Sequence, residues 1–292
     1  MLRTLILALA LAAAPGHVVS QQKLRIVTTS ADLKSLAEAV GGARVDVESL
    51  AAPDHDPHSI ELKPAQLARV RNALLLIRVG LDHEPWLAKL RLPASVLVVD
   101  VSQGARLIQT QTPRLRVERR AHVHAFGNTH YWLDPTNAVP ITAAIRDALA
   151  RLSPQDGQLF DTNRSAFIDT LTNKIEDWKN SLAPFRGTKV VVIHDSWSYF
   201  AERFGLQIVA AAEPNPSVPP SPAELAALFQ RMRAAGVKVL IADPHSNPSL
   251  VRQIATEGGA HAVTLFPSGH DYIGLFDKNV AQLVEALKRA KP

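Results

Sequence analysis

Short β-branched runs alternate with helical patterns along most of this chain, and this alternation restricts the fold more than any other feature. Eight runs fall into two sets of four, at residues 24–28, 45–50, 74–79 and 96–101, and then at 189–193, 206–211, 237–242 and 262–265. Helical patterns such as 222–235 and 248–257 lie between runs of the second set. Strands that alternate with helices form parallel sheets with helices on both faces. We therefore expect an α/β protein of two lobes, each with a parallel four-stranded sheet.

The longest helical pattern lies between the two sets of strands. Apolar residues recur at steps of three, four and seven between Phe160 and Leu182, which marks one face of a helix. Ser153-Pro154 is typical of a helix start, and Pro184 ends the pattern. Such a helix would be roughly 40–45 Å long, enough to join both lobes and limit their hinge motion; a surface helix of one lobe is the alternative. The predicted segments are a signal peptide at 1–20, an N-terminal lobe at 21–152, the connecting helix at 153–184 and a C-terminal lobe at 185–292.

The N-terminus has the pattern of a secretory signal. A basic start at Arg3 is followed by the apolar run 5–14 and by small residues before Gln21. The run is too short for a membrane anchor, which needs about 20 apolar residues. The sequence contains no cysteine, so it offers neither disulfides nor a site for a lipid at the predicted cleavage point. We expect an exported, free periplasmic protein.

The charge pattern argues against a nucleic-acid partner. The formal net charge is only +5, and the densest basic stretch, at 114–120, lies in a polar segment without apolar periodicity. A segment of this kind is most simply a solvated loop. We expect no nucleic-acid binding.

Three of the eleven histidines have suggestive positions. His58 and His194 follow predicted strands, one in each lobe, and His130 precedes a predicted helix. Ligands of parallel α/β sheets bind outside the carboxyl ends of the strands, and imidazole is a good ligand for Zn²⁺ and other first-row metals. Each histidine alone is more simply a surface or capping residue, and periodicity does not show that the three meet.

Three motifs follow one another along the mature chain: DPHSIE at 56–61, NTHYWLDP at 128–135 and HDSWSYF at 194–200. With these motifs the sequence resembles the metal-binding solute-binding proteins of zinc and manganese ABC importers. A further signature resembles 237–244, with Asp243 where the family commonly has glutamate. One motif would be weak; three together are specific.

The resemblance implies two α/β lobes, a connecting helix and a metal held between the lobes by His58, His130 and His194. Histidine at the third position is typical of zinc-type members, which agrees with the preference of manganese for oxygen ligands; manganese or iron stays an alternative cargo. The implied partner is an ABC permease in the inner membrane, with a periplasmic metallochaperone left open. A monomer without enzymatic activity is expected.

Two departures from the family pattern concern the metal. The acid that commonly follows the last strand is missing from the segment 265–269 (LFPSG). We favour Asp271 as the replacement fourth ligand, with His270 or a water as alternatives, although aspartate is also a preferred helix N-cap. The histidine-rich loop of zinc-type members is reduced to His122 and His124, which are either an accessory capture site or solvated loop residues.

Two other functions are compatible with parts of the pattern. Three histidines and a water also form catalytic zinc sites, and Glu61, Asp195 or Glu213 would then be the general base of a hydrolase. A surface adhesin would share the fold, but the missing lipid-attachment cysteine argues against it. We expect metal transport.

Overall fold

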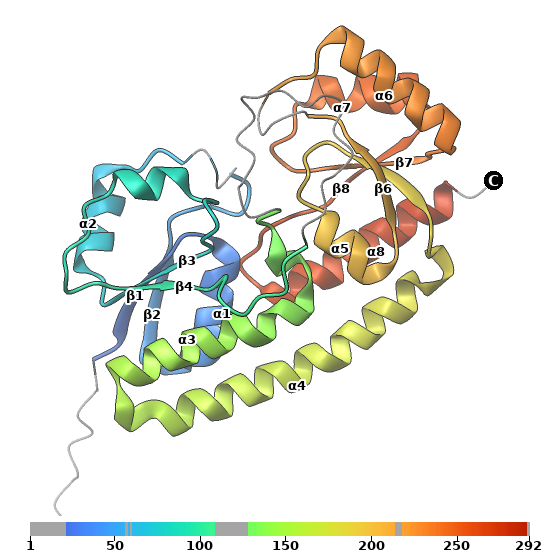
Figure 1. Cartoon of the computed structure of the whole chain (residues 1–292). Coiled ribbons are helices and arrows are strands. Elements are labelled where there is room, and N and C mark those ends of the chain that lie inside the picture. The colour runs from blue at the N-terminus through green and yellow to red at the C-terminus, as the bar shows by residue number, and fades with distance from the viewer. Residues whose placement is uncertain (1–21, 56–57, 59, 109–127, 214–217, 291–292) are drawn as a thin grey trace, which may run out of the picture.

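The computed structural model describes residues 22–55, 58, 60–108, 128–213 and 218–290, and it contains two parallel four-stranded sheets (Figure 1). The N-terminal sheet has the order β2-β1-β3-β4 and the C-terminal sheet the order β6-β5-β7-β8. The strands are β1 (Leu24–Thr28), β2 (Val45–Ser49), β3 (Leu75–Arg78), β4 (Leu97–Asp100), β5 (Lys189–Val192), β6 (Gln207–Ala211), β7 (Val239–Ala242) and β8 (His261–Thr264). All neighbouring strands pair in parallel, which confirms the predicted fold class.

Helices cover both faces of each sheet. They are α1 (Ala31–Gly41), α2 (Pro64–Asn72), α3 (Ala138–Leu152), α4 (Gly157–Leu182), α5 (Ser198–Phe204), α6 (Pro222–Ala235), α7 (Pro248–Gly258) and α8 (Tyr272–Arg289). Successive strand residues therefore enter different cores: Val190 and Val192 pack into the main core, whereas Val191 packs into the core formed with α6 and α7. This is the period of two expected for a strand buried on both faces.

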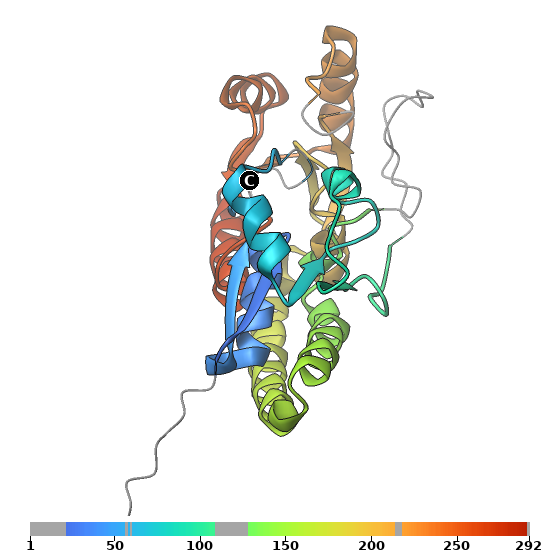
Figure 2. The ribbon, with the colours of Figure 1, turned by 90° about the vertical axis from the view of Figure 1, so that its left-hand side faces the viewer.

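Helix α4 packs against α1 and α3 of the N-terminal lobe and against α5 and α8 of the C-terminal lobe, and it runs along the base of the molecule (Figure 1). Its 26 residues correspond to about 39 Å at 1.5 Å per residue. In Figure 2 it lies beside α3, below the N-terminal sheet. At its other end Trp178 stacks on Phe276 of α8 with ring centroids 4.9 Å apart, and its indole N–H donates to Asp277. A helix anchored at both ends favours small movements between the lobes.

The start of this helix differs from the prediction. Ser153 does not cap it; the hydroxyl donates to Asp156 at 2.6 Å, and Pro154–Asp156 form a 3₁₀ turn before α4 begins at Gly157. Asp156 also forms a salt bridge with Arg44 at 2.8 Å. The Ser153 hydroxyl is therefore part of a side-chain network with Asp156 and Arg44 and does not cap the helix backbone. Asp134 caps the 3₁₀ turn Pro135–Asn137 that precedes α3, since its side chain accepts a hydrogen bond from Thr136 N.

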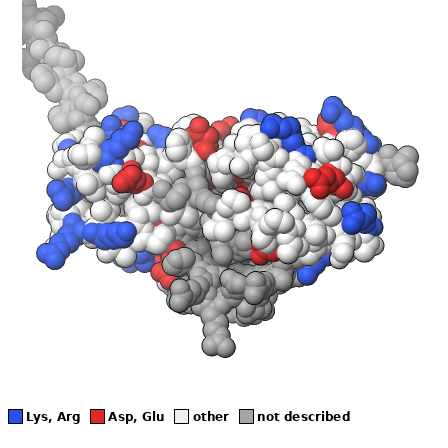
Figure 3. Space-filling model, turned by 90° about the horizontal axis from the view of Figure 1, so that it is seen from above, with Lys and Arg blue, Asp and Glu red and all other residues white. Residues whose placement is uncertain are grey.

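The surface shown in Figure 3 carries interspersed basic and acidic side chains over both lobes. None of the helices in the described ranges is both long and apolar enough to cross a bilayer. The predicted signal peptide at 1–20, the basic stretch at 114–120 and the pair His122 and His124 lie outside the described residues.

Candidate metal centre

The structure brings together His58, His130 and His194, which were singled out in the sequence. One ligand atom of each lies within 4.8 Å of the others, and within the described ranges this is the group of histidine and acidic side chains that fits a metal ion. The Nε2 atoms of His58 and His130 are 3.3 Å apart. Two ligands of a tetrahedral zinc ion would be about 3.3–3.4 Å apart at a Zn–N distance of about 2.0–2.1 Å. The pair is therefore already at ligand spacing.

The group is assembled from both lobes. His58 follows the N-terminal strand β2, His130 precedes the 3₁₀ turn Tyr131–Leu133, and His194 follows the C-terminal strand β5. His130 is buried and the other two are half-buried. An ion held here would contact both lobes at once.

Asn128 connects the loops that carry His130 and His194. Its Oδ1 accepts hydrogen bonds from the backbone N–H of His130 at 2.9 Å and from the Nδ1 of the same residue at 3.0 Å. Its Nδ2 donates to the backbone oxygen of Asp195 at 2.7 Å. The Nδ1 of His130 is therefore a donor, and its Nε2 presents a lone pair toward the other histidines.

His58 is oriented by a strained turn. Its Nδ1 donates to the backbone oxygen of His83 at 3.0 Å, which directs Nε2 toward His130. Before His83, Gly80, Leu81 and Asp82 have φ angles of 81°, 56° and 57°. Each left-handed residue other than glycine costs on the order of 1–3 kcal/mol, and such strain persists only where surrounding contacts enforce it.

Glu84 supplies the contacts that enforce this turn. One carboxylate oxygen accepts from the backbone N–H of Val79 at 2.7 Å and from the hydroxyl of Thr29 at 2.5 Å, and the other accepts from Gly80 N at 3.1 Å. Burial raises the pKa of Glu84 above its ordinary value, although these hydrogen bonds and Arg78 act in the opposite direction. The carboxyl thus holds the strained backbone from inside the lobe.

A fourth histidine, His83, packs against the group and was missed from the sequence. Its buried ring lies 4.2 Å from the His58 ring and 5.3 Å from the His130 ring, measured between centroids. Its Nδ1 is 2.8 Å from the hydroxyl of Thr129. The one available signal was its place after a strand, in a loop at the carboxyl edge of the sheet.

Asp271 and His270 are not part of the group. Asp271 is the exposed N-cap of α8, and its Oδ1 accepts from Gly274 N at 3.0 Å. The capping role that the sequence left open as an alternative accounts for this residue. His270 is also exposed.

The loop before α8 is tied to the N-terminal lobe. Asp32 of α1 accepts from the Ser268 hydroxyl at 2.5 Å and from Gly269 N at 3.2 Å. Trp132, two residues after His130, donates to the backbone oxygen of Pro267 at 2.8 Å. The segment that lacks the acid of the family pattern is thus fixed by contacts across the lobes.

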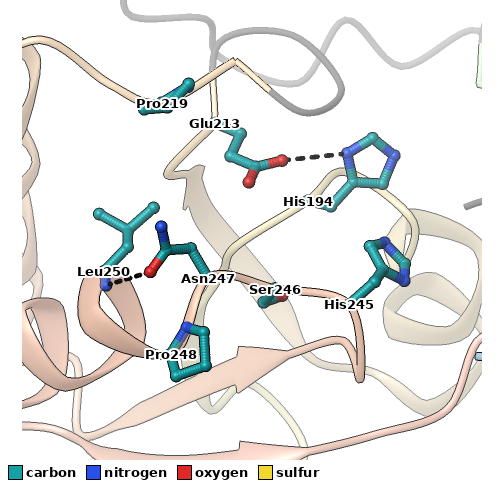
Figure 4. A pocket seen from close by; sticks show the side chains of 8 residues that line it. All are labelled: His194, Glu213, Pro219, His245, Ser246, Asn247, Pro248 and Leu250. Atoms are coloured by element: carbon teal, nitrogen blue, oxygen red, sulfur yellow. Dashed lines mark hydrogen bonds and ion pairs between the residues drawn. The ribbon is translucent and has the colours of Figure 1, made fainter.

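A pocket of about 390 Å³ adjoins the group on its C-terminal side (Figure 4). Its lining residues are His194, Glu213, Pro219, His245, Ser246, Asn247, Pro248 and Leu250. Of the three acids considered as a general base, Glu61 is exposed and Asp195 accepts from the Ser198 hydroxyl at 2.7 Å. Glu213 alone borders the pocket, 3.7 Å from the Nδ1 of His194.

Asp243 directly follows strand β7 and is almost completely buried. Its Oδ1 accepts from the indole N–H of Trp197 at 2.9 Å. Burial raises the pKa of Asp243 to about 6, and the nearby His194 and His245 act in the opposite direction. Acidic side chains are therefore concentrated around the one ligand contributed by the C-terminal lobe.

Residues 26–286 match the sequence profile of a family described as the periplasmic component A of the zinc-uptake complex, ZnuA. The high-affinity zinc uptake system protein ZnuA of Yersinia pestis is 25% identical over 90% of this chain and 91% of that protein. The zinc-binding lipoprotein AdcA of Streptococcus pneumoniae is 24% identical over 98% of this chain. This chain covers only 60% of that relative's length.

Solved structures with these names share the fold. A crystal structure of ZnuA superposes with a TM-score of 0.81 at 26% identity, covering 91% of this chain and 99% of that one. Zn(II)-bound AdcA from Streptococcus pneumoniae gives a TM-score of 0.73 at 24% identity, covering 92% of this chain and 59% of that one. The second likeness bears on the fold alone.

Proposed function

Because the chain belongs to the ZnuA family of zinc-uptake components, we propose that it captures Zn²⁺ outside the cytoplasm and delivers it to an ABC permease. The observation that carries this proposal is the group formed by His58, His130 and His194, whose ligand atoms lie within 4.8 Å of one another. Three imidazoles match the ligand preference of zinc, whereas manganese favours oxygen ligands. Zinc is therefore the proposed cargo, with these three residues as its ligands.

The position of the group between the lobes supports a role in delivery. His58 and His130 belong to loops of the N-terminal lobe and His194 to the C-terminal lobe. A small change in the angle between the lobes would remove His194 from the ligand set and weaken the hold on the ion. The packing of α4 against helices of both lobes keeps that change small.

The remaining assignments follow from family membership and the sequence. We place the mature protein in the periplasm, as the family description states for its members. The proposed segments are an N-terminal lobe at 21–152, the connecting helix at 153–184 and a C-terminal lobe at 185–292. We assign it a binding role and not catalysis, and expect a monomer that docks on its permease, with loading by a metallochaperone left open.

Growth under zinc limitation tests the transport role. Deletion of the gene in a strain with no redundant zinc importer should slow growth in chelator-treated medium, and added zinc should restore it. The parent gene should complement the deletion, and a gene with His58, His130 and His194 all changed to alanine should not. Unchanged zinc uptake in the deletion strain would contradict the proposal.

A further inference from the structure

The Nδ1 atoms of the three proposed ligands have different partners. The Nδ1 of His58 donates to a backbone oxygen, and the Nδ1 of His130 donates to the amide oxygen of Asn128. His194 instead directs its Nδ1 toward the carboxylate of Glu213 at 3.7 Å (Figure 4). The Nδ1 of His194 therefore faces a carboxylate.

The backbone fixes Glu213 beside His194. Glu213 N donates to the backbone oxygen of Ile193 at 2.9 Å, which continues the β5–β6 pairing past the ends of both strands. The register of this pair shifts between Val190 and Val191, where β6 contains one extra residue, Val209. Side chains alternate between faces with a period of two, so an inserted residue reverses the face of every later position. The bulge thus sets the direction of Glu213.

Both side chains are shielded from solvent. The side chain of His194 is 11% exposed and that of Glu213 is 13% exposed. At this burial a carboxylate and an imidazole interact more strongly than at the surface. The separation of 3.7 Å exceeds that of an N–H···O hydrogen bond, about 2.7–3.2 Å, and the adjoining pocket leaves room for the side chain to approach.

We propose that Glu213 is a positioning residue whose carboxylate accepts a hydrogen bond from the Nδ1–H of His194 when His194 binds zinc through Nε2. The inference rests on the proposed function. Zinc withdraws electron density from the ring, which makes Nδ1–H a stronger donor, and the carboxylate in turn strengthens Nε2 as a ligand. Three neutral imidazoles leave the double positive charge of zinc uncompensated. Glu213 supplies a negative charge that reaches the ion through its contact with the His194 ring.

Glu213 is assigned outside the coordination sphere and not as the fourth ligand. Among the described residues, the ligand atoms that lie within 4.8 Å of one another belong to His58, His130 and His194, and the oxygens of Glu213 are outside this group. Its contact is with the Nδ1 of His194, which leaves the Nε2 of the same ring to bind the ion. The carboxylate therefore acts on the ion through the ring.

Zinc affinity of three variants tests the assignment. Glu213→Gln keeps an oxygen acceptor without the charge, Glu213→Ala removes both, and Glu257→Gln removes an exposed carboxylate from α7 as the control. Competition with a chelator should show affinity lowered about 10–100-fold in the first two variants, the usual effect of losing such a partner. The control should match the parent.

Two spectroscopic measurements separate positioning from other roles. The visible absorption of the Co²⁺-loaded Glu213→Gln variant should equal that of the parent, because the ligands are unchanged. Long-range ¹H–¹⁵N NMR of the zinc-loaded parent should show the His194 proton on Nδ1, with a downfield shift that is lost in the variant. A changed cobalt spectrum would indicate that Glu213 is a direct ligand. Zinc affinity equal to that of the parent in the Glu213→Gln variant would show that Glu213 has no role in binding. Either result overturns the inference.

The outcomes also distinguish this inference from the proposed function. If the parent does not bind zinc, the function fails before Glu213 is tested. If the parent binds and the Glu213 variants bind equally, the inference alone fails. Glu213→Asp retains the charge on a shorter side chain and should still weaken binding, which guards against misfolding of the alanine variant.

Discussion

The carboxylate of Asp32 on helix α1 accepts a hydrogen bond of 2.5 Å from the hydroxyl of Ser268, in the loop that leads to helix α8. The two residues are 236 positions apart in the sequence and join the two lobes. Burial raises the pKa of Asp32 to about 7, and the hydrogen bonds from Ser268 and Gly269 oppose this rise. The ionised form is therefore disfavoured in the folded protein.

The raised pKa of Asp32 predicts a pH-dependent stability. In the unfolded chain an aspartate has a pKa of about 3.9, so between about pH 4 and pH 7 the folded state binds more protons than the unfolded state. The contribution of Asp32 to stability therefore falls as the pH rises through this interval. Urea unfolding of metal-free protein should show this slope, and Asp32→Asn should reduce it. Identical slopes in the parent and the variant would contradict the assignment.

Zinc should stabilise the protein through the three histidines. A ligand that binds only the folded state stabilises it by about 4 kcal/mol at a thousandfold excess over Kd. Zinc should therefore raise the melting temperature, and alanine at His58, His130 or His194 should diminish the rise. Calorimetric melting with and without zinc measures both effects. A rise untouched by all three substitutions would move the site elsewhere.

Zinc affinity should also decline in acid. Each imidazole must lose its proton to bind the ion, and the ordinary histidine pKa is about 6.5. Affinity should be nearly constant above neutrality and fall progressively below about pH 6.5. Chelator competition at several pH values measures this, and affinity that stays constant down to pH 5 would argue against neutral imidazole ligands.

Glu84→Gln should weaken zinc binding without touching the ion. The amide can no longer accept from both Gly80 N and the partners Val79 and Thr29, so a buried donor is left unsatisfied at a cost of about 1–3 kcal/mol. The strained turn would relax and shift the backbone oxygen that orients His58. Urea unfolding and zinc competition should both change. A loss of stability with unchanged zinc affinity would show that this turn does not control the metal site.

Asp271→Ala should lower stability and leave zinc affinity intact. The side chain caps α8 by accepting a hydrogen bond from Gly274 N, and loss of such a cap costs roughly 1 kcal/mol.

 Thermal melting and chelator competition on the same preparation measure the two quantities. If this variant bound zinc much more weakly than the parent, Asp271 would be a ligand in the loaded protein, as the sequence pattern first suggested.

The sequence predicted the regular elements well where local signals agree. Helix α6 (Pro222–Ala235) begins and ends as expected, because Ser221 and Glu224 form a capping box and Gly236 adopts the left-handed conformation that ends a helix. The strands were found from their apolar runs, since strands buried on both faces are continuous in the sequence. The predicted start of α4 was too early. Ser153 donates a hydrogen bond to Asp156, which is held by the distant Arg44, and this long-range contact has no local signal in the sequence.

The surroundings of the metal centre depend on long-range contacts and could not be predicted. Neither the packing of His83 on His58 nor the approach of Glu213 to His194 has a local signature, and the second depends on a one-residue bulge in β6. The left-handed φ angles of Leu81 and Asp82 could not be predicted from the sequence either, since neither residue type favours that conformation as glycine does. The three proposed ligands were identifiable because motifs mark them.

Anomalous diffraction at the zinc edge, from crystals of protein purified without a histidine tag and loaded with one equivalent of Zn²⁺, tests the central claim most directly. We predict one strong peak about 2.0–2.1 Å from the Nε2 atoms of His58, His130 and His194. A peak elsewhere on the molecule, or a peak that touches fewer than these three rings, would contradict the account.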